Sequence, residues 1–381
     1  MHAALVHMRH GPSGGTERYL DQLSAHLARA GHEVTVVCRS HGAPSHPSIR
    51  FRVLRSPAVG GAWRMWAFAR DVERHLAGEG YDLVVGLGKT WSQDVLRLGG
   101  GSHASYVELA HAETLSPLER ALGKGRLKNA LALAIERRAL RPGAYRAVIA
   151  NSRMVAEEVR ARYGVPEERL AVIYNGVDIE RFHPRLRGGP GRELRRALGI
   201  DPGTLVVLFL GSGYGRKGLS ELLEAFSGLA GEHGDLRLLV AGRDSSQRAF
   251  EARARRLGIE RACRFIGPRS DPETCYAAAD LYVLPTRYDP FANTTLEALA
   301  SGLAVITTAT NGASELLASG AEGSVLPRER GPELLLAELR AWSDRDRLAA
   351  ASPAARALAE RHSEPRAMQE TTALIDDLTP R

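Results

Sequence analysis

Two carboxylates, Asp289 and Glu297, flank a polar segment that is expected to form a loop leading into a helix. A carboxylate accepts hydrogen bonds from neighbouring hydroxyl groups, so this pair suits a sugar or ribose better than a phosphate. We expect the helix to start near Asn293 or Thr294, which are good N-cap residues. Free amides at its positive end would suit a diphosphate. Taken alone, the segment is equally consistent with a surface loop and an ordinary helical glutamate.

A glycine-rich segment, 211–218, follows an apolar run at 205–210 and carries two adjacent cations, Arg216 and Lys217. The glycines allow close backbone approach, and the cations could neutralise the charge that grows on a departing nucleotide diphosphate. Each motif is weak evidence by itself. Both, however, follow strands of one predicted sheet, and ligands of open α/β sheets bind at the carboxyl ends of the strands. We therefore expect the two motifs to face the same crevice.

The first forty residues predict the elements that would position an N-terminal site. An apolar strand at 3–8 is followed by a glycine loop at 11–15, a helix at 16–30 and a strand at 34–38. This order predicts a parallel sheet with right-handed crossovers. Further strands of this half are expected at 83–85, 147–150 and 170–174.

A second series of strands follows a connection and short helix at 184–203. These strands are expected at 205–210, 236–241, 264–266, 281–284 and 304–307. Their unbroken apolar runs are typical of strands buried on both faces. Because 381 residues are too many for one core, we predict an α/β protein with two Rossmann-like doubly wound domains facing across a cleft. Their expected bounds are 1–183 and 184–360, with a C-terminal helix at 361–381 packing back toward the N-terminal domain.

Composition narrows the class of protein. The net charge of +7 suits anionic partners, whereas 6% aromatic residues and no RNA-binding signature argue against nucleic acid. No apolar run approaches the ~20 residues of a membrane-spanning helix. The start of the chain has no basic leader, so we expect a cytoplasmic protein. The three cysteines, which are scattered along the chain, are Cys38, Cys263 and Cys275. Their spacing predicts neither a disulfide framework nor a zinc site.

The segment 120–146 is strongly basic, with apolar residues interleaved at helical spacing. Its cations are Arg120, Lys124, Arg126, Lys128, Arg137, Arg138, Arg141 and Arg146. The simpler interpretation is a solvated helix packed on the N-terminal domain. The sharper hypothesis is peripheral contact with anionic lipid at the inner face of the cytoplasmic membrane, or with a phosphorylated acceptor.

Taken together, the motifs resemble those of the family 4 retaining glycosyltransferases of the GT-B fold, and most of all the branch that adds hexoses to the core of lipopolysaccharide. The resemblance extends from Gly14 to about Val325. It rests on 14–18, 172–178 with Phe182 and Pro184, 215–218, 278–281 and 289–297. It implies an N-terminal acceptor domain and a C-terminal donor domain.

The resemblance also implies roles for the charged residues. Glu297 would hold the ribose hydroxyls, and Asp289 would touch the hydroxyls of the donor sugar, although the family usually has the longer glutamate there. Arg216 and Lys217 would hold the diphosphate. Many members carry an arginine directly after the glycine matched by Gly211. This chain has Ser212 instead, so the phosphate clamp is expected to rely on the other two cations.

The remaining implied contacts come from backbone groups and from the N-terminal domain. Amides of the loop would meet the phosphates and sugar, and its residues are Phe291, Ala292, Asn293 and Thr294. Ile266 and Arg269 lie in the segment that grips the base, usually uracil. Gly14 and Gly15 would lie beside the donor phosphates and the acceptor, unless they form a turn needed only for packing. His103, in an expected exposed loop, would lie near the reacting sugar, unless it is a plain solvent-exposed histidine.

The implied function is retaining transfer of a hexose, with glucose expected, from a UDP-sugar to a lipid-linked or lipopolysaccharide-core glycan, without cofactor or metal. Two alternatives stay open: a GT-B epimerase or hydrolase of nucleotide sugars, and a non-catalytic protein that binds them. A nicotinamide oxidoreductase is disfavoured because 11–15 does not match GxGxxG. Asp344 and Asp346 form a DxD string, but its charge-rich surroundings do not favour a metal site.

Overall fold

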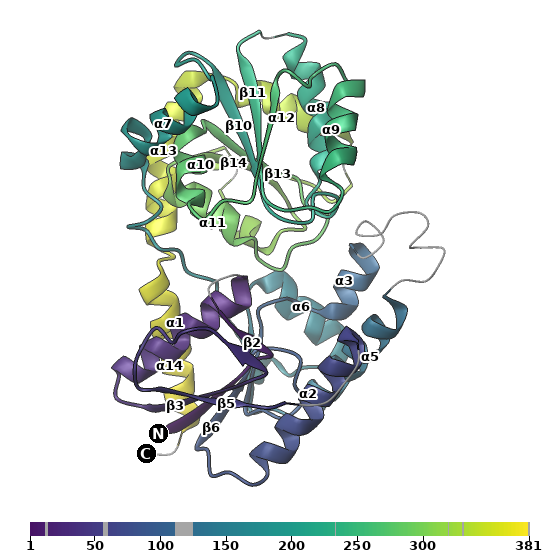
Figure 1. Ribbon diagram of the computed structural model, residues 1–381, viewed down its shortest axis with the longest axis vertical. Coiled ribbons are helices and arrows are strands. Elements are labelled where there is room, and N and C mark those ends of the chain that lie inside the picture. Colours follow the sequence, from purple (N-terminus) through teal and green to yellow (C-terminus); the bar gives the residue numbers. More distant parts are fainter. Residues whose placement is uncertain are drawn as a thin grey trace. The chain divides into compact units, whose positions relative to one another are not determined.

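The computed structural model describes the chain except for residues 12–13, 56–59, 111–124, 233, 319, 330 and 380–381. It divides into two compact units. The first unit comprises Met1–Tyr174 with Pro365–Arg381, and the second comprises Asn175–Glu364 (Figure 1). The boundary expected at 183/184 differs from this division, because residues 175–183 belong to the second unit, where Val177 forms a parallel bridge with Ser363.

The first unit contains a sheet whose strands all pair in parallel, in the order β5-β3-β1-β6-β7-β8-β9. The strands are β1 (His2–Val6), β3 (Glu33–Cys38), β5 (Ile49–Val53), β6 (Leu83–Gly86), β7 (Val95–Leu98), β8 (Ala147–Ala150) and β9 (Leu170–Val172). Two short strands, β2 (Arg9–His10) and β4 (Ser40–His41), pair with each other. The helices are α1 (Gly15–Arg29), α2 (Gly61–Leu76), α3 (His103–Leu109), α5 (Arg126–Ala139), α6 (Arg153–Tyr163) and α14 (Glu364–Leu378).

Both faces of this sheet are covered, which explains the unbroken apolar run of its central strand. Along β1, Ala3 and Leu5 pack in a core with residues of α1 and α14. The alternate residues Ala4 and Val6 pack with Phe68 and Val72 of α2. Successive side chains of a strand point to opposite faces, so a strand buried on both sides needs apolar residues at every position.

The second unit repeats this architecture with a parallel sheet in the order β12-β11-β10-β13-β14-β15. The strands are β10 (Leu205–Leu210), β11 (Leu236–Ala241), β12 (Cys263–Gly267), β13 (Leu281–Leu284), β14 (Ala304–Thr308) and β15 (Gly323–Leu326). The helices are α7 (Pro190–Ala197), α8 (Leu219–Ala230), α9 (Gln247–Arg256), α10 (Pro272–Ala278), α11 (Asn293–Ala300), α12 (Pro332–Ala341) and α13 (Arg345–Glu360). From β10 the chain winds outward through β11 and β12, and β13 then returns to the other side of β10. The boundary between β10 and β13 is therefore a topological switch point, where α/β proteins bind ligands.

The two segments where the chain passes from one unit to the other are joined by backbone hydrogen bonds. The Val177 amide donates to the His362 carbonyl at 3.0 Å, and the Glu364 amide donates to the Val177 carbonyl at 2.9 Å. At Gly176 a Cβ would lie 2.4 Å from the Glu364 Cα, so the close approach requires glycine there. Beyond Glu364, α14 packs its Ala367, Met368 and Ile375 into the core of the first unit.

The predicted α/β class with two parallel-sheet, Rossmann-like domains is confirmed. Among the described residues, every helix is either too short or too polar to cross a lipid bilayer.

Candidate active site

The loop after β10 is held against the end of β13 by a glycine contact and by backbone hydrogen bonds. Gly218, with φ of +81°, approaches so closely that a Cβ would lie 2.0 Å from the Pro285 carbonyl oxygen. The Arg287 amide donates to the Arg216 carbonyl at 2.9 Å, and the Thr286 hydroxyl donates to the same oxygen at 3.1 Å. Substitution of Gly218 would therefore separate the two loops that carry the charged residues.

The backbone of Asp289 is fixed on its other side by the loop that follows β14. Its amide donates to the Thr310 carbonyl at 2.9 Å, and its carbonyl accepts from the Gly312 amide at 2.9 Å. The Asn311 side chain adds to this connection, because its Oδ1 accepts from the Ala292 amide at 3.0 Å and its Nδ2 donates to Thr295 at 3.0 Å. The position of Asp289 is thus determined by the loops after three neighbouring strands.

Asp289 is the centre of a buried cluster of charges. Its Oδ2 accepts from Lys217 Nζ at 2.5 Å and from Arg216 Nη1 at 3.0 Å. The same Arg216 nitrogen donates to the Tyr288 carbonyl at 2.8 Å. Lys217 and Asp289 are each 7% exposed. Two cations therefore share one carboxylate oxygen, and the cluster keeps a formal charge of +1 in a buried place.

Burial and charge act in opposite directions on Asp289. Burial raises the pKa of its carboxyl group, but the charges and hydrogen bonds of Lys217 and Arg216 outweigh this and lower that pKa to about 2. Burial lowers the pKa of Lys217, with Asp289 opposing that shift and Arg216 adding to it. Asp289 is consequently a carboxylate at any physiological pH and keeps both cations oriented.

Helix α11 begins at Asn293, four residues after Asp289. The N-cap is Ala292, which makes no side-chain capping hydrogen bond, so the expectation that Asn293 or Thr294 caps the helix is wrong. Within the described part of the chain, the backbone amides of those two residues donate to no protein acceptor. An uncapped helix start leaves such donors available to an anion.

Hydrogen bonds from neighbouring segments fix three side chains of α11. Tyr276 donates its hydroxyl to Glu297 Oε2 at 2.8 Å in the buried interior. Tyr282 donates to the Thr294 hydroxyl at 2.7 Å, and Asn175 donates to Asn293 Oδ1 at 2.6 Å. Sequence reasoning missed these supporting residues as parts of the site. No local sequence pattern indicates these contacts, because they depend on the order of the strands, in which β13, which carries Tyr282, lies next to β10.

The other candidate residues for donor binding lie at the carboxyl ends of strands of the same sheet. Gly211 begins the loop after β10, and the Ser212 hydroxyl accepts from the Arg243 amide at 3.3 Å. Phe291 and Ala292 are buried, at 5% and 3% exposure. Ile266 and Arg269 lie at the end of β12, which β11 separates from β10. Arg269 forms a bidentate ion pair with Asp271, at 2.9 and 2.6 Å, and is not within this charge cluster.

The N-terminal candidates belong to the first unit. Gly14 is the N-cap of α1 with φ of +107°, and Gly15 is the first residue of that helix. His103 is the first residue of α3 and half-buried, whereas an exposed loop was expected. The reason is Ser102, whose hydroxyl caps α3, together with Glu136, whose carboxylate accepts from the His103 amide. Burial lowers the pKa of the imidazole, and its Nε2 lies 3.2 Å from Asn129 Oδ1.

Part of the basic segment lies outside the described residues, including Arg120 and Lys124. The described part, from Arg126 to Ala139, is α5. Arg138 donates to Glu73 at 2.5 Å and lies over the Trp91 ring at 4.3 Å, so it has a structural role. Asp344 of the DxD string caps α13, accepting from the Asp346 amide at 2.8 Å.

Comparison with known proteins matches both halves of the chain to glycosyltransferase families. Residues 13–181 match the model "Glycosyltransferase Family 4", and residues 191–357 match "Glycosyl transferases group 1". The chain is 30% identical over 339 residues to D-inositol 3-phosphate glycosyltransferase of Mycobacterium sp. (strain KMS), covering 83% of this chain and 75% of that one. It is 26% identical over 333 residues to lipopolysaccharide glucosyltransferase WaaG of Escherichia coli K12, covering 86% of each.

Solved structures agree on the fold. The crystal structure of WaaG, a glycosyltransferase involved in lipopolysaccharide biosynthesis, matches with a TM-score of 0.82 at 24% identity, covering 98% of this chain and 99% of that one. HepE from Anabaena, solved in complex with UDP-glucose, matches with a TM-score of 0.71 at 21% identity, covering 99% and 100%. The two domains therefore have the GT-B fold that the resemblance implied.

Proposed function

Because this chain belongs to glycosyltransferase family 4, we propose that it transfers a hexose from a UDP-sugar to a glycan or glycolipid, with retention of configuration at the anomeric carbon. The observation that supports this most is the cluster of Arg216, Lys217 and Asp289 directly before the uncapped start of α11. Cations and free amides together suit a nucleoside diphosphate leaving group. We propose glucose as the hexose and a lipid-linked or lipopolysaccharide-core glycan as the acceptor, in line with the name of the relative WaaG.

In this proposal Arg216 and Lys217 bind the diphosphate and stabilise the charge that develops as it leaves. Asp289 holds both cations in place through one oxygen, Oδ2. Its second oxygen, Oδ1, has no hydrogen-bond partner among the residues that the structure describes, so it is free to accept from a hydroxyl of the donor sugar. One side chain would thereby connect the position of the sugar to that of the diphosphate.

The start of α11 would complete the donor site. The amides of Asn293 and Thr294 would donate to the phosphates, and Glu297 would accept from the ribose hydroxyls. Tyr276 orients the Glu297 carboxylate by its hydrogen bond. We assign the backbone of Ile266 and Arg269 to the uracil base, and Gly14, Gly15 and His103 to the reacting sugar and acceptor.

For the chemical step we propose attack by the acceptor hydroxyl on the same face that the diphosphate leaves. A departing phosphate oxygen would take the acceptor proton, and the bond to the leaving oxygen would break as the new glycosidic bond forms. The cations at 216 and 217 supply the charge that a divalent metal supplies elsewhere. We therefore propose a reaction that needs neither metal nor cofactor.

The test is incubation of the protein with UDP-glucose and candidate glycan acceptors in the presence of EDTA, followed by NMR of the product. We expect an α-linked glucoside, and a β-linked product would contradict retention. UDP-glucose without acceptor distinguishes the alternatives, because free glucose would indicate a hydrolase and a changed sugar an epimerase. Donor binding without any turnover would indicate a non-catalytic protein. Thermal shifts with UDP-, GDP- and ADP-sugars test the choice of nucleotide.

We further propose that the protein acts in the cytoplasm, in peripheral contact with the inner membrane face through cations of 120–146, and that it binds no nucleic acid.

A further inference from the structure

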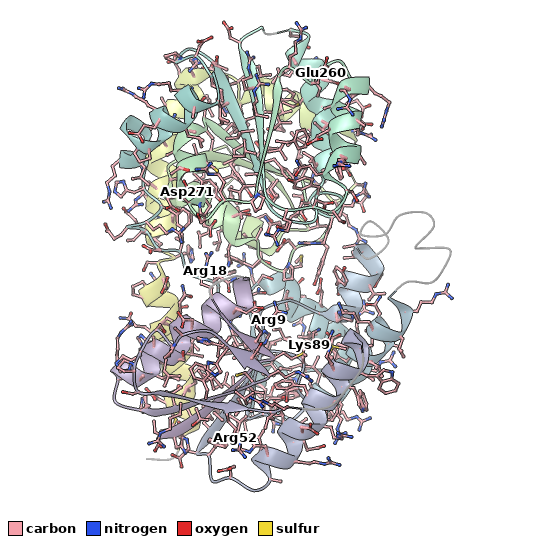
Figure 2. The ribbon with its side chains drawn as sticks, in the orientation of Figure 1. Arg9, Arg18, Arg52, Lys89, Glu260 and Asp271 are labelled. Atoms are coloured by element: carbon pink, nitrogen blue, oxygen red, sulfur yellow. The ribbon has the colours of Figure 1, made fainter. Side chains whose placement is uncertain are left out.

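Lys89 adopts a backbone conformation that lysine rarely occupies. It follows β6 in the first unit, where Figure 2 labels it, and its φ is +63°. Within the described part of the chain, every other residue with positive φ is a glycine. A Cβ makes this left-handed region unfavourable, and such strain concentrates at functional sites. A glycine at position 89 would adopt this conformation without strain, and the preceding residue, Gly88, has a similar φ of +90°. The lysine side chain is therefore the feature to explain.

The side chain lines a pocket of about 170 Å³ in the first unit. The pocket lies at the carboxyl ends of β6 and β7 and is bordered by α3 and α5. Its polar walls include Lys89, His103, His7 and Arg97. At roughly 30 Å³ per water molecule, this volume would hold five or six waters, which is the size range of one sugar unit.

Among the described residues, the Lys89 ammonium makes no hydrogen bond or ion pair with a side chain. Burial lowers the pKa of Lys89, and the charge of Glu136 opposes that shift. Glu136 is the acid that lines the pocket, but its carboxylate is already occupied. It accepts from the Ser102 hydroxyl at 3.2 Å, the Ala104 amide at 3.2 Å, the His103 amide and the Tyr163 hydroxyl. Glu136 therefore acts on Lys89 only through the field of its charge, and the ammonium keeps its capacity to bind an anion.

The other groups around the pocket do not compensate this charge. Burial lowers the pKa of His103, and Lys89 lowers it further. Burial also lowers the pKa of His7. The charge of Glu17 opposes this shift, and the charge of Lys89 adds to it. Both imidazoles are thus uncharged near neutral pH. Arg97 adds a second cation, buried with its guanidinium 3.4 Å from the centre of the Tyr19 ring.

We propose that this pocket binds a sugar carrying a carboxylate or a phosphoryl group, with the Lys89 ammonium as its counter-charge. The uncharged imidazoles of His7 and His103 would accept hydrogen bonds from the ring hydroxyls. The assignment of this sugar as part of the acceptor rests on the proposed function, whereas its binding does not. The lysine thereby gives the pocket a preference for charged over neutral sugars, and the strained backbone is the cost of placing the ammonium there.

The experiment is a ligand-detected NMR titration with glucuronate, glucose 6-phosphate and glucose. The protein is first saturated with UDP, so that Arg216 and Lys217 do not bind the anionic probes. For the wild type we expect at least one of the two anionic sugars to bind about tenfold or more tightly than glucose, as a hydrogen bond to a charged group allows. Lys89→Gln should abolish the preference. Arg29→Gln is the control, because Arg29 is an exposed cation at the end of α1 that does not line the pocket.

A second variant separates binding from folding. Lys89→Gly removes the ammonium in a residue that accepts the left-handed backbone, so it should raise the midpoint of thermal unfolding while abolishing the preference. Equal binding of all three sugars by the wild type, failure of both anionic sugars to bind, or a preference that survives in both variants would overturn the proposal. If the wild type binds the anionic sugars preferentially but transfers no hexose, only the proposed function is contradicted.

Discussion

Lys217 and Asp289 lie 72 residues apart in the chain, yet the lysine Nζ and the carboxylate Oδ2 are 2.5 Å apart. The contact forms at the switch point, because β10 and β13 are hydrogen-bonded neighbours and the loop after each carries one partner. Removing Asp289 would leave the buried ammonium of Lys217 without this counter-charge, at a cost of several kcal/mol. The pair therefore connects the stability of the second unit with its capacity to bind a charged donor.

Acid should destabilise the second unit through Asp289. Its folded-state pKa of about 2 lies below the ordinary value of 3.8, so the stabilisation is complete above pH 4 and is lost as the pH falls toward 2. The difference corresponds to roughly 2 kcal/mol. Urea unfolding between pH 5 and pH 2 measures it, and Asp289→Asn should show a flatter profile. An identical profile for wild type and variant would contradict the assignment of the titration to this residue.

Arg216→Ala and Lys217→Ala should each lower kcat/KM for UDP-glucose by about two orders of magnitude, or about 3 kcal/mol, because each removes one charge that stabilises the leaving diphosphate. Steady-state kinetics with a fixed acceptor measures the effect. Arg287→Ala is the control, since Arg287 belongs to the same pair of loops but forms its ion pair with Glu221, at 2.6 Å. Wild-type rates in either of the first two variants would refute the role given to that cation.

Glu297→Gln should raise the KM for UDP-glucose roughly tenfold, because it replaces a charged acceptor for the ribose hydroxyls with a neutral one. A 2′-deoxyribose analogue of UDP-glucose makes the test specific. The wild type should bind this analogue less tightly than UDP-glucose, whereas the variant should distinguish the two poorly. Equal discrimination by both proteins would place the ribose elsewhere.

Lys89→Gly should stabilise the first unit by about 1 kcal/mol, since it removes the strain of a left-handed lysine. Chemical denaturation measures the change. Lys128→Gly provides a comparison of opposite sign, because a glycine inside α5 should cost about 1 kcal/mol. Destabilisation by the first substitution would mean that the lysine side chain supports the fold.

Lys128→Glu combined with Arg137→Glu should weaken binding to vesicles that contain phosphatidylglycerol, because both side chains are exposed on α5. Co-sedimentation at low salt measures it. Arg138 is left unchanged, since its ion pair with Glu73 would confound the result. Arg192→Glu combined with Arg196→Glu, which makes the same change in charge on exposed residues of α7, is the control. Equal binding by the two variants would argue against a specific membrane surface.

The strands that could be predicted from the sequence are those buried on both faces. The expected bounds of β8, β10, β11 and β13 are those observed. Strands β8, β10 and β13 are continuous apolar runs, and β11 has four apolar residues in a row after Arg237. Strand β5 was missed because it lies at a sheet edge and alternates apolar residues with arginine. Strand β7 was missed because it contains a charged residue, Arg97, which the fold buries.

In the candidate site, too, some contacts could be predicted from the sequence and others could not. Arg216, Lys217 and Asp289 could be expected to meet because strand ends of one sheet bring loops together. Contacts that depend on the order of the strands could not be inferred locally. Asn311 supports the loop before α11 from the end of β14, and no local pattern around it indicates that role.

The pairing of Val177 with the segment around His362 has a mechanical consequence. The chain passes between the units twice, and both passages are anchored to each other on the side of the second unit. A lone covalent connection would permit free twisting about its own axis, whereas two tethered ones resist torsion and leave bending as the softer motion. A rotation of one unit against the other would then be absorbed by the few backbone torsions just before Asn175 and just after Glu364.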